Sequence, residues 1–186
     1  SISLRGAKLC NRLDEAEYYA SKITGTDDES ILNACRLVWF DQVYRTGRCG
    51  FGDPLDAVPD HETCENVRTM VNRTGHFLKF YGGIVESGPV FPGGYSEIVV
   101  KGDGDFTTED IMWDLKVSKN PPTAIHTLQV AMYYIMAKHS TVKSYVTLEK
   151  IGIFNPRLNI AYVLDMSKVD RRIINEIESE VIGYAK

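Results

Sequence analysis

The sequence predicts an α/β protein in which helices flank a mixed central sheet and a helical part comes first. Helical spacing of apolar residues dominates roughly the first 80 positions, and short β-branched or aromatic segments dominate thereafter. The 186 residues are 44% apolar and 25% charged, as in an ordinary globular domain. We therefore expect one domain over residues 1–186, with a helical part over about 1–81 and a core that carries the chemistry over about 82–186.

Capping and stop residues bound the expected helices. Asp28 or Ser30 can cap the second helix, and Gly47 can end it. Thr123 follows the helix-breaking pair Pro121-Pro122 and can cap a strongly apolar helix. The expected helices cover residues 13–23, 28–44, 61–80 and 123–139, and Ser167 caps a closing helix.

The second half of the chain contains the expected strands. Pro92 and two glycines interrupt the first of these segments, and a tight turn joins the second to the third. The order of three strands, a helix, two strands and a helix is typical of a mixed sheet. The expected strands cover residues 90–95, 97–107, 111–117, 145–154 and 160–165.

The formal net charge of −4 argues against a protein that holds nucleic acid through bulk positive charge. It does not exclude an enzyme that meets phosphate groups through a bound metal ion, because carboxylate ligands themselves add negative charge. No run of 18 apolar residues is present, so we expect no membrane span.

The cysteines and the first residues favour a cytoplasmic protein. The segment that begins at Ser1 lacks the apolar core of a signal peptide. The four cysteines form no C-x-x-C pair, which argues against a zinc site, and we expect all four to be reduced.

An acidic hairpin is the most informative segment. If Glu109 and Asp110 form its two-residue turn, Asp105 lies opposite Asp114. Side chains alternate between the faces of a strand, so both aspartates share one face with Lys116. The other face would carry Phe106, Trp113, Leu115 and Val117.

Two opposed carboxylates repel each other, and a cation or a shared proton relieves the repulsion. Oxygen ligands of this kind suit Mg²⁺ or Mn²⁺. The alternative is a solvated polar face, on which Asp103 and Lys116 form a cross-strand ion pair.

The apolar helix after the hairpin carries Gln129 and Tyr133 one turn apart on one face. A buried amide needs a hydrogen-bond partner. The pair is either a satisfied part of the core or a polar pair directed at the acidic hairpin.

Three motifs in this order resemble those of the PD-(D/E)XK nuclease superfamily, in the RecB-like branch that includes lambda-exonuclease-type enzymes. They are G-x-x-D at Gly102–Asp105, D-x-K at Asp114–Lys116 and Q-x-x-x-Y at Gln129–Tyr133. The hairpin at Gly152–Arg157 is also similar to a strand of that branch, and the resemblance covers roughly residues 62–165. It implies a restriction-endonuclease-like fold.

The resemblance also implies a Mg²⁺- or Mn²⁺-dependent phosphodiester hydrolase, that is, a nuclease. Lys116 would orient or deprotonate the attacking water, a role that agrees with a lysine whose pKa is lowered beside a metal. The implied metal ligands are Asp105, Asp114 and the carbonyl of Leu115, and Gln129 and Tyr133 would line the site.

Members of the family often add an upstream acidic or histidine ligand. We expect Glu62 in this role, and the alternative is a glutamate that the dipole favours at a helix N-terminus. Lys119 could meet backbone phosphates, or it could be a solvated lysine that discourages strand pairing. No cysteine follows Cys64, which argues against an iron–sulfur cluster.

We expect a nuclease that acts on DNA. The alternative is a catalytically inactive module of the same fold that binds DNA or a protein partner. The sequence leaves open the oligomeric state, the choice between DNA and RNA, and exonuclease versus endonuclease action.

Overall fold

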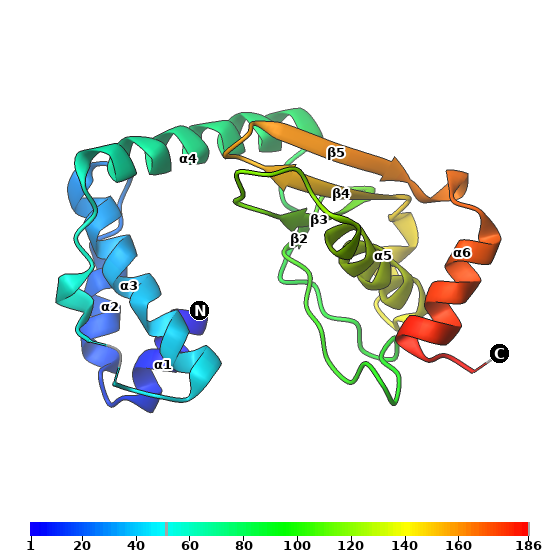
Figure 1. The fold of residues 1–186 in the computed structure, drawn as a ribbon, viewed down its shortest axis with the longest axis horizontal. Coiled ribbons are helices and arrows are strands. Elements are labelled where there is room, and N and C mark those ends of the chain that lie inside the picture. The colour runs from blue at the N-terminus through cyan, green and yellow to red at the C-terminus, as the bar shows by residue number, and fades with distance from the viewer. Residues whose placement is uncertain (51, 186) are drawn as a thin grey trace. The chain divides into compact units, whose positions relative to one another are not determined.

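The computed structural model describes residues 1–50 and 52–185 (Figure 1). The chain forms two compact units, Ser1–Asn72 and Arg73–Lys186. The boundary falls inside helix α4 (His61–Tyr81), whereas the sequence placed the end of the helical part at about residue 81.

Helices make up the first unit: α1 (Ile2–Leu9), α2 (Leu13–Ser21), α3 (Asp28–Thr46), the short η1 (Pro54–Asp56) and the start of α4. Asp27 caps α3, because its Oδ1 accepts a hydrogen bond from Ser30 N at 3.0 Å. The caps expected at Asp28 or Ser30 are therefore wrong, whereas the expected end at Gly47 is confirmed. Helix α1 was not expected.

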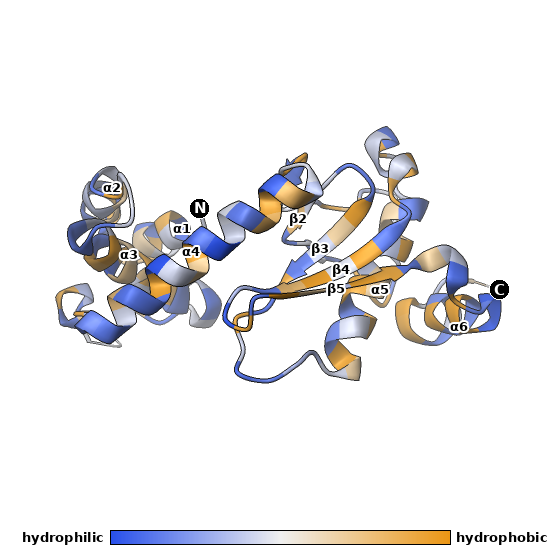
Figure 2. Ribbon diagram, turned by 90° about the horizontal axis from the view of Figure 1, so that it is seen from above, coloured by the Kyte–Doolittle hydropathy of each residue, from blue (hydrophilic) through white to orange (hydrophobic). Residues whose placement is uncertain are grey.

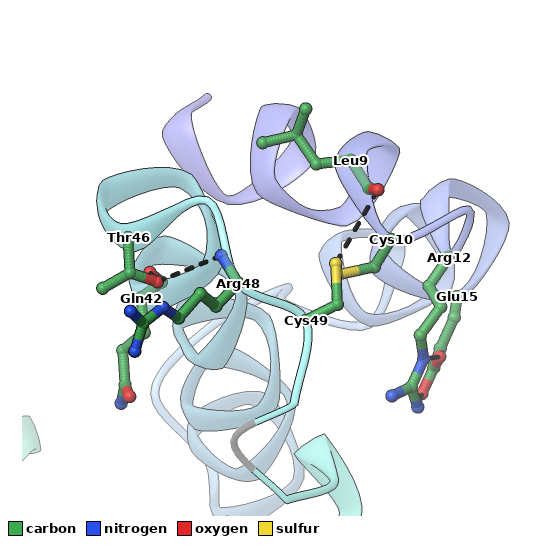
Figure 3. The surroundings of a disulfide bond; sticks show 8 residues. All are labelled: Leu9, Cys10, Arg12, Glu15, Gln42, Thr46, Arg48 and Cys49. Atoms are coloured by element: carbon green, nitrogen blue, oxygen red, sulfur yellow. Dashed lines mark hydrogen bonds and ion pairs between the residues drawn. A yellow bond between two sulfur atoms is a disulfide. The ribbon is translucent and has the colours of Figure 1, made fainter.

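The expectation of four reduced cysteines is wrong. Cys10 and Cys49 form a disulfide with their Cα atoms 5.7 Å apart, which joins the end of α1 to the segment after α3 (Figure 3). Cys35 and Cys64 are free thiols. Disulfides are rare in cytosolic proteins, so this bond is evidence against the expected cytoplasmic location. No other structural feature of the described residues tests that location, and it stays a prediction.

The second unit contains a mixed sheet of five strands in the order β1-β2-β3-β4-β5. Strands β3 and β4 are parallel, the other neighbours are antiparallel, and α5 (Ala124–His139) connects the parallel pair. The strands are β1 (Glu86–Ser87), β2 (Phe106–Thr107), β3 (Ile111–Leu115), β4 (Lys150–Asn155) and β5 (Ile160–Asp165). The α/β class with a mixed sheet is thus confirmed.

The two strands expected before the hairpin differ most from the structure. Residues 90–95 form no strand, and of 97–107 only Phe106–Thr107 does. Gly94 explains part of this difference, because a Cβ there would lie 2.0 Å from the carbonyl oxygen of Met136. The segment follows a helix closely instead of pairing along a strand.

The C-terminal segment forms several short helices, whereas the sequence predicted one closing helix. The short η2 (Lys143–Thr147) precedes β4. After β5 the chain forms η3 (Met166–Lys168), α6 (Arg171–Glu176) and the π-helical η4 (Ile177–Ile182). Asp170 caps α6 by accepting from Arg172 N at 2.9 Å, so the cap expected at Ser167 is wrong.

The two faces of the sheet carry different cores. Met112, Ile151 and Ile153 pack with Val130 and Met136 of α5 on one face. The other face carries an aromatic cluster of Phe77, Phe106, Trp113 and Phe154. Figure 2 shows apolar residues along β4 and β5 and over much of α5. None of the helices in residues 1–50 and 52–185 has the length and apolar character needed to cross a bilayer.

Candidate active site

The β2–β3 hairpin has the register that the sequence predicts. Phe106 pairs with Trp113 and Thr107 pairs with Met112, the register that, continued by one residue beyond β2, sets Asp105 opposite Asp114. Trp113 belongs to the aromatic cluster. Because successive side chains of a strand point to opposite faces, Asp114 points to the face that α5 covers.

The hairpin closes through the expected turn at Glu109 and Asp110, as Thr108 N donates to Ile111 O at 3.0 Å. This turn lacks the glycine or asparagine that two-residue turns favour. Lys150 of β4 compensates, since its Nζ lies 2.6 Å from Asp110 Oδ2.

Asp114 is a buried carboxylate with an unsatisfied oxygen. Its residue is only 3% exposed. Oδ2 lies 3.0 Å from the ammonium of Lys116, yet it accepts no well-directed hydrogen bond. Burial raises the pKa of Asp114 above its ordinary value, the ammonium of Lys116 lowers it in part, and the charge of Asp105 raises it further. Lys116 offsets only part of the cost of burying this carboxylate, so a further cation would stabilise its charged form.

Asp105 is exposed and is fixed by the backbone of the neighbouring strand. Its Oδ2 accepts a hydrogen bond from Leu115 N at 2.6 Å. The bond holds this carboxylate beside β3, at the residue that follows Asp114, and its negative charge contributes to the raised pKa of Asp114.

A chain of polar contacts leads from Asp114 to helix α5. The Nζ of Lys116 donates to Gln129 Oε1 at 3.1 Å, and Gln129 Nε2 donates to the hydroxyl of Tyr133 at 2.9 Å. Tyr133 in turn stacks on Phe91 with ring centroids 5.6 Å apart. The amide of Gln129 thus has its partners, and it fixes the position of the ammonium.

Asn155 helps to position the segment that carries Lys116, and the sequence did not predict this role. It is buried at the end of β4, and its Nδ2 donates to Ser118 O at 2.9 Å. Lys116 N also donates to Phe154 O at 3.0 Å. These bonds anchor the segment that carries Lys116. A buried asparagine that ends an apolar strand just before Pro156 was the available signal.

Two further predicted residues, Lys119 and Glu62, have exposed side chains. Lys119 is exposed in the segment between β3 and α5. Glu62 is exposed in the first turn of α4, in the unit Ser1–Asn72. Lys116 pairs with Asp114, so the cross-strand ion pair considered between Asp103 and Lys116 is not what the structure contains.

The donor set fits a hard divalent cation that keeps most of its water. No three His, Cys, Asp or Glu side chains in the described part of the chain gather into a metal-binding group. Mg²⁺, however, is usually held by one or two carboxylates together with water and substrate phosphates. The carboxylates of Asp105 and Asp114 would provide such a pair.

Comparison with protein-family models, with curated proteins and with solved structures yields no match.

Proposed function

We propose that this protein is a metal-dependent nuclease of restriction-endonuclease-like fold that hydrolyses DNA phosphodiester bonds with Mg²⁺ or Mn²⁺. The observation that carries the proposal is the buried carboxyl of Asp114, whose Oδ2 is ion-paired with Lys116 but accepts no well-directed hydrogen bond, while the carboxylate of Asp105 is held at the next residue of β3. A buried carboxyl whose pKa is raised, beside a specific charged partner, marks a candidate functional site, because burying the charge costs stability.

In this proposal Asp105 and Asp114 hold the cation, and the carbonyl of Leu115 is a further candidate ligand. A bound divalent ion would polarise the phosphoryl oxygen and neutralise charge that develops on it. Asp105 has a fixed position because Leu115 N holds its Oδ2, which lowers the cost of ordering the site.

Lys116 orients the attacking water and stabilises negative charge on the phosphate. Gln129 Oε1 holds its ammonium at 3.1 Å, close to Asp114. Tyr133 fixes the amide of Gln129. The two α5 residues are therefore positioning residues for Lys116, and Lys119 is available for more distant phosphates.

Cleavage of labelled single- and double-stranded DNA in Mg²⁺, in Mn²⁺ and in EDTA tests the proposal. We expect metal-dependent cleavage that falls about 100-fold or more in Asp114→Asn and in Lys116→Gln, since each removes a group that acts on the reacting atoms. Asp103→Asn is the matched control, because Asp103 is exposed near the same hairpin and is not paired with Lys116. It should cleave like the wild type.

Two outcomes would contradict the proposal. One is equal cleavage by the wild type and both site variants. The other is absence of cleavage together with absence of Mg²⁺ or Mn²⁺ binding in calorimetry. If such a protein still bound DNA or a protein partner, it would be the inactive module, in which Lys116 alone neutralises Asp114.

A further inference from the structure

Strand β5 is an open edge of the sheet. It is the last strand in the sheet order, and in residues 1–50 and 52–185 only β4 pairs with it (Figure 1). The pairing runs without a bulge over all of Ile160–Asp165. Natural edge strands are commonly short, bulged or protected by lysine or proline, and this segment contains neither residue. The opposite edge, β1, has only two residues, so β5 alone offers a full strand to another chain.

The hydrogen bonds of β4 show which residues of β5 face outward. Met166 N donates to Glu149 O at 3.1 Å, and bonded pairs alternate along an antiparallel ladder. On the other side of β4, Phe154 O accepts a hydrogen bond at 3.0 Å from the segment after β3, so Phe154 is turned away from its β5 partner Ala161. Ala161 and Val163 therefore direct their N–H and C=O groups away from the sheet, where a further strand could bond to them.

The side chains along this edge are apolar and exposed on both faces of the sheet. Tyr162 and Leu164 pair with Ile153 and Ile151, so they lie on the face that α5 covers. Val163 lies on the other face and is 43% exposed. A hollow of about 200 Å³ beside the strand is lined mostly by apolar residues of β4, β5 and α5. An added strand would thus cover apolar surface as well as satisfy the backbone.

We propose that β5 is the interface of a homodimer, in which β5 of a second copy of this chain pairs with it antiparallel about a two-fold axis. Ala161 of each copy bonds to Val163 of the other, and the two Tyr162 side chains lie opposite each other. This pairing uses the outward-facing groups and joins the two five-stranded sheets into one continuous sheet. The homodimer does not depend on the nuclease function.

Charges at the two ends of β5 favour a second copy as the occupant and select this register. Arg157 lies just before the strand and is exposed, and Asp165 ends the strand. The only ion pair of Asp165 in the described part of the chain is a loose one with Lys168, at 3.8 Å. In an antiparallel pair the beginning of each strand meets the end of the other, so Asp165 becomes a diagonal neighbour of Arg157 of the second copy at both ends. A parallel pair would bring like charges together.

Sedimentation velocity over a range of protein concentrations, with substitutions at Val163, measures the dimer. Val163→Pro removes an outward N–H and no bond to β4, and proline is tolerated on edge strands, so the monomer should keep its fold. We expect the dissociation constant of the dimer to rise about 100-fold, because each copy loses one hydrogen bond across the interface. Val163→Ile is the matched control: it keeps the N–H and the branched apolar side chain, and it should stay within about threefold of the wild type.

Hydrogen exchange of the wild type gives a second measurement that needs no variant. At high protein concentration the amide of Val163 should exchange slowly, and after dilution it should exchange fast. The amide of Leu164, which is bonded to β4, should stay protected at both concentrations. Arg157→Glu should raise the dissociation constant about tenfold, because it places like charges together at both ends of the interface. Arg171→Glu, at an exposed position of α6, is its control and should have no effect.

Three results would overturn the homodimer. One is a wild type that is monomeric at the highest concentration used for hydrogen exchange. Another is a dimer in which the Val163 amide exchanges fast at every concentration, which would place the interface elsewhere; this result decides even if Val163→Pro fails to fold. The third is a monomer whose Val163 amide is protected by an added extended apolar peptide of unrelated sequence, which would assign the edge to a different protein.

Discussion

Aspartates in the two units behave in opposite ways. In the first unit Asp27 is exposed to solvent and receives hydrogen bonds from the backbone and hydroxyl of Ser30, which lower its pKa. In the second unit burial raises the pKa of Asp114, and one of its oxygens is left unsatisfied. The first arrangement stabilises a helix, whereas the second is costly and is typical of a place where a ligand acts.

The units also differ in what holds them together. A disulfide closes the first unit across a sequence separation of 39 residues, around a small core that includes Tyr19 and Phe40. The second unit relies on a larger apolar core and an aromatic cluster. Covalent closure supplements a small core in the first unit, whereas the second unit has a larger packed core.

Reduction of the disulfide should change the difference in stability between the two units more than any other treatment proposed here. We expect dithiothreitol, or the variant Cys10→Ser/Cys49→Ser, to lower the unfolding free energy of the first unit by about 3 kcal/mol, because the unfolded chain regains entropy. Hydrogen exchange should show faster exchange in α1–α3 and little change in β3 and β4.

Cys35→Ala is the control, since it leaves the disulfide in place and should respond to dithiothreitol like the wild type. Equal acceleration in the strands and in the helices would contradict the separation of the two units. No response at all would show that the bond does not contribute to stability.

Substitution of Asp114 should have a smaller effect, and its sign depends on pH. The folded pKa of Asp114 lies above its ordinary value of 3.8, so its contribution to stability is lost as pH rises from that value through the folded pKa. Asparagine cannot lose a proton. In EDTA we therefore expect Asp114→Asn to gain about 1 kcal/mol over the wild type above this window, and nothing below it.

Urea unfolding across this pH range measures the difference. A variant that is less stable than the wild type at neutral pH would mean that the ion pair with Lys116 outweighs the cost of burying the charge.

Asp27→Asn should show the smallest effect, with the opposite sign. The pKa of Asp27 is lowered, so its contribution is present above the ordinary value of 3.8 and is lost as pH falls through the folded pKa. Asparagine still caps a helix. The variant should melt slightly below the wild type at neutral pH, and the difference should disappear in acid.

Melting temperatures measured against pH test this expectation. Glu17→Gln, at an exposed position of α2, is the control and should leave the curve unchanged. A constant difference at every pH would contradict a role for the charge of Asp27.

The hairpin could be predicted from sequence because local rules determine it. The turn at Glu109 and Asp110 sets the register, and alternation then places Asp105 beside Asp114. The helix that carries Gln129 and Tyr133 could likewise be predicted from its apolar run and its cap. Contacts accordingly link Asp114 to Lys116, Lys116 to Gln129 and Gln129 to Tyr133, and Asp105 is bonded to the residue after Asp114.

Contacts between distant parts of the chain explain what could not be predicted. Helix α1 is short, and it lies against α3 at Gly6, where a Cβ would lie 2.0 Å from Phe40 O. The path of residues 90–101 likewise depends on the close approach of Gly94 to α5. The disulfide could not be predicted because its formation depends on the redox environment of the protein, which the sequence does not determine. Glu62 lies in the other unit, so spacing alone could not establish its role.

The aromatic cluster limits which residue can occupy position 152 of β4, where the chain has a glycine. A Cβ at this position would lie 2.3 Å from the indole of Trp113, so any larger residue must displace that ring. Trp113 and Asp114 are consecutive residues of β3. A shift of the indole that moved the β3 backbone would therefore also move the carboxylate of Asp114. A mutational screen for loss of function should therefore recover changes at Gly152, a position without any side chain to take part in chemistry.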